Sequence, residues 1–137
     1  MDVALAFDSH RTFEHERLTL TTERQALERD TAWYREFNVK RALSTIARCV
    51  SEVAVLNEHI AFAQRDLDAQ TSLAVRQVVR ARLEELESKV KWIFAEADRA
   101  EADLERWRSF DFPNAVRRLL AIEAREAQLR HALGGPL

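Results

Sequence analysis

The chain has 137 residues and nearly balanced charge, with 21 basic and 23 acidic side chains and a formal net charge of -2. It contains two glycines and two prolines, too few to build the turns of a β-sheet or a loop-based active site. The composition therefore favours an all-helical protein and gives no long-range attraction to nucleic acid or to an anionic membrane.

The expected compartment follows from the cysteine count and from the absence of targeting signals. Cys49 is the only cysteine, so an intramolecular disulfide is excluded and a reducing environment suits the chain. The first residues lack the basic segment of a signal peptide, and no stretch reaches the roughly 20 apolar residues that span a bilayer. We expect a cytoplasmic protein.

The N-terminal part of the chain has a weak helical pattern. Large apolar residues recur every seven positions but alternate with polar ones, so this stripe is only half apolar. We expect a helix from Thr22 to Phe37, and we expect residues 1–21 to be weakly ordered. The apolar positions are Phe13, Leu20, Leu27 and Tyr34, and the polar positions between them are Arg17, Arg24 and Thr31.

A stronger pattern begins at Val39. Positions at alternating steps of four and three form a heptad seam, which predicts a long helix with one buried face. Asn57 interrupts this seam, and a single polar residue at such a position specifies the pairing register. The seam consists of Val39, Leu43, Ile46, Val50, Val53, Asn57, Ile60, Gln64 and Leu67.

A second heptad seam follows and is almost entirely apolar, which predicts another long helix. The two seams are out of phase across residues 68–72, where Thr71 or Ser72 can cap the next helix. We therefore favour an antiparallel helical hairpin over one continuous rod, and keep the rod as the alternative. The second seam consists of Val79, Leu83, Leu86, Val90, Ile93, Ala97, Ala100, Leu104 and Trp107.

The clearest helix boundary lies after Phe110. Asp111 is a good N-cap and Pro113 suits the first turn, so a shorter amphipathic helix begins here. The glycines from Gly134 stop it, and we expect residues 134–137 to fray. Its apolar face consists of Ala115, Leu119, Ile122, Leu129 and Leu133.

These helices can be combined into an elongated four-helix bundle, a single all-α domain over residues 1–137. An antiparallel first helix would place Leu20 opposite Val55 and Phe13 opposite Phe62, so that two uncovered stripes meet. The last helix would return along the third helix, with Leu129 and Leu133 at the level of Trp92 and Ala95.

The sequence offers no convincing catalytic, cofactor or metal site. No glycine precedes residue 134, which excludes a phosphate-binding glycine loop. The cluster at residues 14–16, Glu-His-Glu, places consecutive side chains in different directions on a helix, which is unsuitable for shared metal ligation. His59 lacks the following glycine that a phosphotransfer histidine needs, so a structural role is favoured. We expect a protein that is not an enzyme and carries no cofactor or metal.

The candidate partner-binding residues lie near the predicted turn between the two long helices. Basic and apolar side chains alternate there, a mixture that suits docking on a protein surface. Trp92 and Phe94 lie off the seam, and two alternatives stay open for them, packing within the chain or between chains. The candidate set is Val75, Arg76, Val79, Arg80, Arg82, Trp92 and Phe94.

The function that fits these features is a non-enzymatic protein-protein interaction module. We expect a small adaptor, regulator or inhibitor that binds a larger protein of unknown identity and forms a homodimer. The alternative is a DNA-associated regulator that uses Arg76, Arg80 and Arg82, and a steep loss of nucleic-acid affinity with salt would distinguish it.

Overall fold

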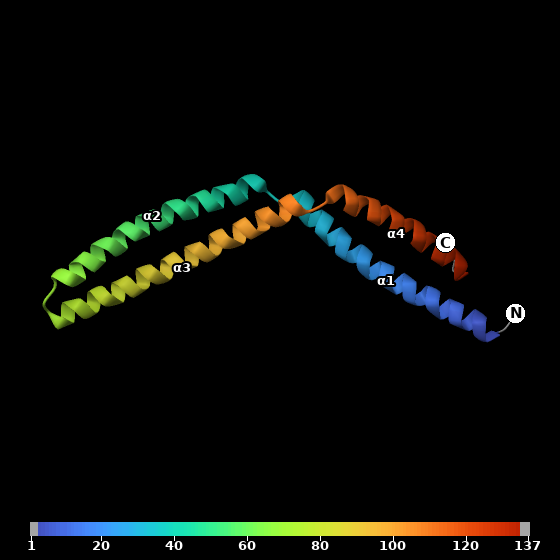
Figure 1. Cartoon of the computed structure of the whole chain (residues 1–137), viewed down its shortest axis with the longest axis horizontal. Helices are drawn as coiled ribbons and strands as arrows, with labels where there is room; N and C mark the ends of the chain where they lie inside the picture. Colours follow the sequence, from blue (N-terminus) through green and yellow to red (C-terminus); the bar gives the residue numbers. More distant parts are fainter. Residues whose placement is uncertain (1–2, 135–137) are drawn as a thin grey trace. The chain divides into compact units, whose positions relative to one another are not determined.

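The computed structural model describes the chain from Val3 to Gly134, and over this range it is helical without strands. The all-helical prediction is confirmed for this part of the chain. Four helices follow one another along the sequence (Figure 1): α1 Val3–Glu36, α2 Val39–Ala69, α3 Leu73–Ser109 and α4 Phe112–Ala132. The fraying expected for residues 135–137 lies outside the described residues.

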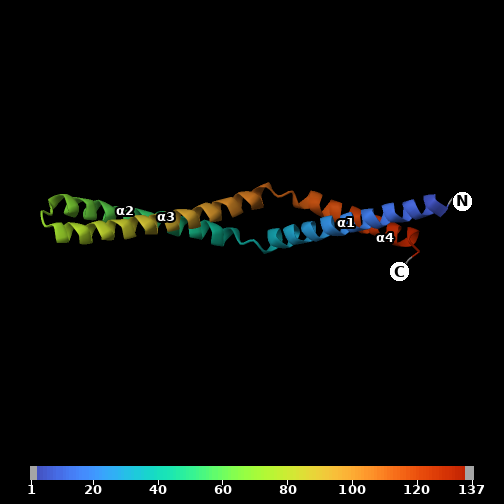
Figure 2. The same cartoon turned by 90° about the horizontal axis from the view of Figure 1, so that it is seen from below.

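The helices pair into two compact units. Helices α1 and α4 form one unit, and α2 and α3, which are joined through residues 70–72, form the other. Within each unit the two helices lie side by side in both views (Figures 1 and 2). Each unit therefore has a two-helix core of its own.

Local capping explains where the helices begin. The side chain of Asn38 accepts a hydrogen bond from the backbone N–H of Arg41 at 3.0 Å, which satisfies one free donor at the start of α2. Asp111 accepts in the same way from the N–H of Asn114 at 3.0 Å, and a proline follows in the first turn of α4. The predicted boundary at Asp111 is confirmed.

Small side chains of α2 line its contact with α3. Ala42, Cys49 and Ala63 are buried and Leu56 is half-buried, and these four positions are spaced by seven residues. Ala63 packs with the buried Leu83 and Leu86 of α3, around which half-buried side chains gather: Leu56, Ile60, Leu67 and Val79. The small residues allow the two helix backbones to approach closely and leave room for the leucines of α3.

Four of the nine positions of the predicted α2 seam were wrong by one residue. Leu43 and Val50 are 48% and 64% exposed, and Asn57 and Gln64 are exposed as well. The buried face uses the neighbouring Ala42 and Cys49, because a step of three as well as a step of four returns to the same side of a helix. On α3, every position of the predicted seam is buried or half-buried.

The first helix packs on the last, which corrects the predicted partners of both. Leu20 of α1 forms a core with Ile122 and Leu129 of α4, and Phe13 and Leu27 pack against it. Helix α4 thus covers the stripe of α1 that was expected to lie on Val55 and Phe62 of α2.

Ion pairs fix the direction of this contact. Arg125 donates a hydrogen bond to Glu16. Arg118 lies seven residues earlier in α4 and donates to Glu23, which lies seven residues later in α1. The two helices therefore run antiparallel. At their other end the rings of Tyr34 and Phe112 stack with centroids 5.0 Å apart.

Candidate protein-binding groove

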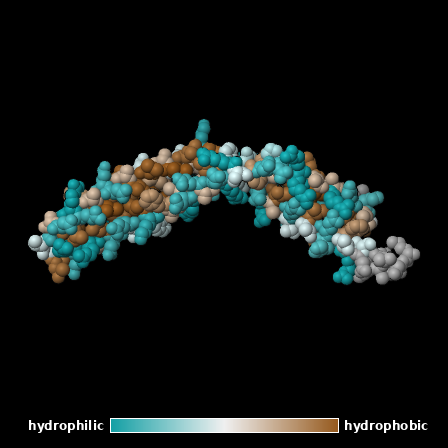
Figure 3. All heavy atoms as spheres, in the orientation of Figure 1, coloured by the Kyte–Doolittle hydropathy of each residue, from teal (hydrophilic) through white to brown (hydrophobic). Residues whose placement is uncertain are grey.

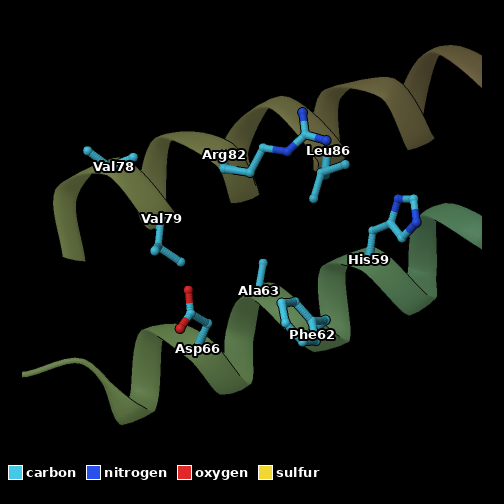
Figure 4. A pocket seen from close by; sticks show the side chains of 8 residues that line it. All are labelled: His59, Phe62, Ala63, Asp66, Val78, Val79, Arg82 and Leu86. Atoms are coloured by element: carbon cyan, nitrogen blue, oxygen red, sulfur yellow. The ribbon is translucent and has the colours of Figure 1, made fainter. Parts of the chain in front are cut away.

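A groove runs between α2 and α3 near their connection. It encloses about 440 Å³ and its sides come from both helices (Figure 4). We call it the tip groove. Its lining residues are His59, Phe62, Ala63 and Asp66 of α2, and Val78, Val79, Arg82 and Leu86 of α3.

The tip groove has an apolar floor and exposed apolar walls. Ala63, Val79 and Leu86 belong to the core of the α2–α3 pair and form the floor. Phe62 is 67% exposed and Val78 is 70% exposed, although each carries a large apolar side chain. Exposure of this apolar area to water is unfavourable, so an apolar ligand that covers it in the groove would be stabilised.

Polar side chains also line this groove. His59 and Asp66 come from α2 and Arg82 from α3 (Figure 4). The Arg82 Nη1 lies 3.2 Å from Glu85 Oε2, and Lys89 Nζ lies 3.4 Å from Glu85 Oε1. The hydrogen bond from Arg82, followed by the one from Lys89, lowers the pKa of Glu85 below its ordinary value. The α3 side of the groove therefore carries an ionised network at neutral pH.

The apolar surface extends from the tip groove along the same face of the pair. Val55 lies seven residues before Phe62, and Trp92 lies fourteen residues after Val78, so each pair shares a face of its helix. Val55 is 51% exposed and Trp92 is 79% exposed. Together with the tip groove, these residues form what we call the groove face. Figure 3, which shows one side of the molecule, has brown apolar atoms at the surface of the α2–α3 pair.

The structure separates the basic residues that were predicted to act together. Arg76 Nη1 donates to the backbone carbonyls of Leu67 and Gln70, each at 3.2 Å, and so caps the end of α2. Arg82 lines the tip groove, whereas Arg80 lies two residues away, about 200° around a helix. The three arginines Arg76, Arg80 and Arg82 thus do not form one basic patch.

The predicted apolar site residues are also divided. Val79 is half-buried in the floor of the tip groove, and Val75 is 41% exposed beside the α2–α3 connection. Trp92 belongs to the groove face. Phe94 is 52% exposed and lines a separate hollow of about 160 Å³ together with Val50, on the other side of the pair.

Sequence reasoning missed several members of the tip groove, namely His59, Phe62, Asp66 and Val78. Phe62 could have been selected, because a large apolar residue off the buried seam needs a cover of its own. The sequence analysis assigned that cover to α1. The sequence did not indicate His59 and Asp66 as groove residues, because polar residues of the same types occur on any solvent-exposed helix face.

The described residues provide no metal site and no membrane-crossing helix. No group of three or more potential ligands among His, Cys, Asp and Glu is found in this part of the chain. The two carboxylates of the Glu14-His15-Glu16 cluster are paired with arginines, Glu14 with Arg17 and Glu16 with Arg125. Between residues 3 and 134, none of the helices is both long and apolar enough to cross a bilayer.

Comparison of the chain with protein-family models, with curated proteins and with solved structures finds no match. Its function is therefore argued from its own surface.

Proposed function

We propose that the chain is a non-enzymatic protein-protein interaction module, a small adaptor, regulator or inhibitor that binds a partner protein in the tip groove. The observation that carries this proposal is the exposure of Phe62 and Val78 on either side of an apolar floor. Soluble proteins rarely leave contiguous apolar surface uncovered unless it binds something.

The shape of the groove indicates the form of the partner segment. It lies between two helices, and the exposed apolar side chains Val55 and Trp92 follow on the same face of α2 and α3. A helix of another protein, with apolar residues at steps of three and four, fits such a surface. The polar groups of His59, Asp66 and Arg82 would then lie at the rim, where polar contacts set orientation and specificity.

Photo-crosslinking tests the proposal in the native host. A photoreactive phenylalanine analogue replaces Phe62 in one variant and Phe94, on the other side of the pair, in the matched control. We expect position 62 to capture one defined partner, identified by mass spectrometry, and position 94 not to capture it. Capture of that partner from position 94 alone would place the binding surface elsewhere.

Charge and polarity changes on purified protein test the same surface. Phe62→Asp and Arg82→Glu should each weaken binding of the identified partner by tenfold or more, about 1.4 kcal/mol. The matched controls Phe94→Asp and Arg80→Glu should bind the partner with a dissociation constant within about twofold of that of wild type. Circular dichroism checks that all four variants keep their helical content.

The distribution of the arginines bears on the DNA-binding alternative. Arg76 is used on backbone carbonyls and Arg82 is paired with Glu85, while Arg80 lies on another side of α3. Binding of DNA through this region would require a contiguous basic surface. We therefore propose a protein partner, and salt-sensitive DNA binding abolished by Arg80→Glu would contradict the choice.

A further inference from the structure

A second exposed surface of α2 lies on the side of the helix away from α3, because its central residues are two positions, about 200°, from the contact residues Cys49, Leu56 and Ala63. Seven positions follow one another at alternating steps of four and three, and every one of them is exposed. None carries a charge over about six helical turns, and three are alanine at intervals of seven. We call this surface the alanine face: Leu43, Ala47, Val50, Ala54, Asn57, Ala61 and Gln64.

We propose that the alanine face binds the alanine face of a second copy of this chain, with the two α2 helices antiparallel across a two-fold axis at Ala54. The inference concerns a surface separate from the tip groove, so it does not depend on the partner proposed there.

The periodicity supports a helix as the occupant. Exposed helix positions are normally polar or charged, whereas steps of four and three without charge are typical of a helix contact. Ala47, Ala54 and Ala61 present almost no side chain, so a second backbone can approach closely along the stripe. Helix α2 would then contact α3 on one side and another helix on the opposite side.

The order of residues along the stripe supports a second copy. In an antiparallel pair centred on Ala54, the residue numbers of opposed positions sum to about 108. Ala47 then meets Ala61 of the other copy, and Val50 meets Asn57. This pairing opposes no two long side chains at the centre of the contact.

The charges that end the stripe are complementary in the same register. Lys40 lies one helical step before Leu43, and Asp68 lies one step after Gln64. Their numbers also sum to 108, so each lysine would lie near the aspartate of the other copy at both ends. A parallel pairing would instead oppose lysine to lysine and aspartate to aspartate, which is unfavourable.

The larger apolar side chains of the alanine face supply additional contact. Leu43 is 48% exposed and Val50 is 64% exposed in the single chain. A helix lying on the alanine face would cover both. Burial of these side chains adds hydrophobic stabilisation to a contact that alanines alone would make weak.

Cysteine cross-linking of the full-length protein tests the register. Ala54→Cys should form a disulfide-linked dimer under mild oxidation, because the two copies of residue 54 meet at the axis. Ala47→Cys and Ala61→Cys should each cross-link poorly alone and efficiently when mixed. Wild type, oxidised in the same way, is the control for cross-linking through the native Cys49, which is buried with 1% exposure.

Sedimentation velocity tests the contact without cross-linking. Ala54→Glu, which opposes two carboxylates at the axis, should raise the dimer dissociation constant by tenfold or more. Its matched control, Val55→Glu on the groove face, should leave self-association unchanged. A monomeric wild type, or Ala47→Cys that links to itself as well as Ala54→Cys does, would overturn the proposal.

Discussion

Arg24 of α1 donates a hydrogen bond from Nη1 to Oε2 of Glu126 in α4 at 2.8 Å, and the side chain of Glu126 is only 8% exposed. Glu126 lies between the core residues Ile122 and Leu129, so its carboxylate is held at a position that an apolar residue would normally occupy. Its other oxygen, Oε1, is buried without a hydrogen-bond partner. The ion pair is therefore the main compensation for a costly burial.

Removal of Arg24 should destabilise the α1–α4 unit more than removal of one partner of an exposed ion pair would. Arg24→Ala leaves a buried carboxylate without its charged donor, and we expect a loss of about 1 to 3 kcal/mol. Hydrogen exchange of α1 and α4 amides measures this unit separately. Protection equal to that of wild type would show that water reaches Glu126 and replaces the guanidinium.

Replacement of the glutamate should have the opposite sign. Glu126→Leu removes both the buried charge and the unpaired oxygen, and fills the space between Ile122 and Leu129. The remaining Arg24 is 30% exposed and lies 3.7 Å from Glu28, so it is not left as a buried charge without a partner. We expect stabilisation of about 1 to 3 kcal/mol, the usual cost of a buried polar atom without a hydrogen-bond partner. The same exchange measurement checks it, and reduced protection would mean that the ion pair is a net stabilising contact.

The surface ion pairs of this unit give it a dependence on acid. Arg118 donates to both oxygens of Glu23 at 2.7 and 2.8 Å, and Arg125 donates to both oxygens of Glu16 at 2.7 and 3.0 Å. These hydrogen bonds lower the pKa of each carboxyl below the ordinary 4.5 in the folded state.

A carboxyl group whose pKa is lowered in the folded state stabilises the protein at pH values above its ordinary pKa. This stabilisation is lost as the pH falls below the ordinary pKa and through the lowered one. We expect the protection of α1 and α4 to decrease as pH falls from about 6 to about 3. The double variant Glu16→Gln, Glu23→Gln should show a smaller decrease. Identical pH profiles for the variant and wild type would exclude these pairs as the cause.

The close packing of α2 on α3 should be sensitive to added volume. Ala63 is buried against Leu83 and Leu86, so Ala63→Leu overfills the contact and should cost about 1 to 3 kcal/mol. Ala81→Leu, at an exposed position of α3, is the matched control and should change stability by less than about 0.5 kcal/mol. Urea denaturation followed by circular dichroism compares the two, and equal midpoints would contradict close packing at Ala63.

The sequence could predict the buried face of α3 and most of the helices because both depend on local patterns. It did not predict the first half of α1, which was expected to begin at Thr22 and begins at Val3, because the apolar stripe there is only half apolar. The α3 seam contains large apolar residues at nearly every position, and no neighbouring set competes with it. On α2 the heptad pattern included the larger Leu43 and Val50, whereas the structure buries the neighbouring Ala42 and Cys49. Side-chain size alone does not decide burial, because small residues also fill positions where two helices approach closely.

Which helix packs on which could not be derived from the chain order. The apolar stripes of α1 and α4 were each expected to cover a helix adjacent in sequence, since neighbouring elements usually pack together. The observed pairing joins residues far apart in the chain, such as Arg24 and Glu126, which are 102 residues apart. Arg24 was treated as a polar interruption of its stripe, and Glu126 was not considered, because a charged side chain is expected to be solvent-exposed until its partner is known.

The tip groove was also predicted only in part, because its shape depends on how α2 packs on α3. The mixed basic and apolar composition located the region, but the division of its side chains among faces depends on the register of α2 against α3. Phe62 faces the groove because α3 covers another side of α2, and Arg76 turns to the backbone because the chain reverses beside it.

Arg76 provides the last test, because its role in the structure differs from the docking role expected for it. Its Nη1 donates to the carbonyls of Leu67 and Gln70, which the end of α2 leaves without helical partners. Arg76→Ala should lower stability by about 0.5 to 1.5 kcal/mol per lost hydrogen bond and increase exchange of amides around residues 66–76. Arg80→Ala is the matched control and should leave both unchanged. A partner that binds in the tip groove should still bind Arg76→Ala, since the cap lies outside the groove; loss of binding with an unchanged exchange pattern would restore Arg76 as a docking residue.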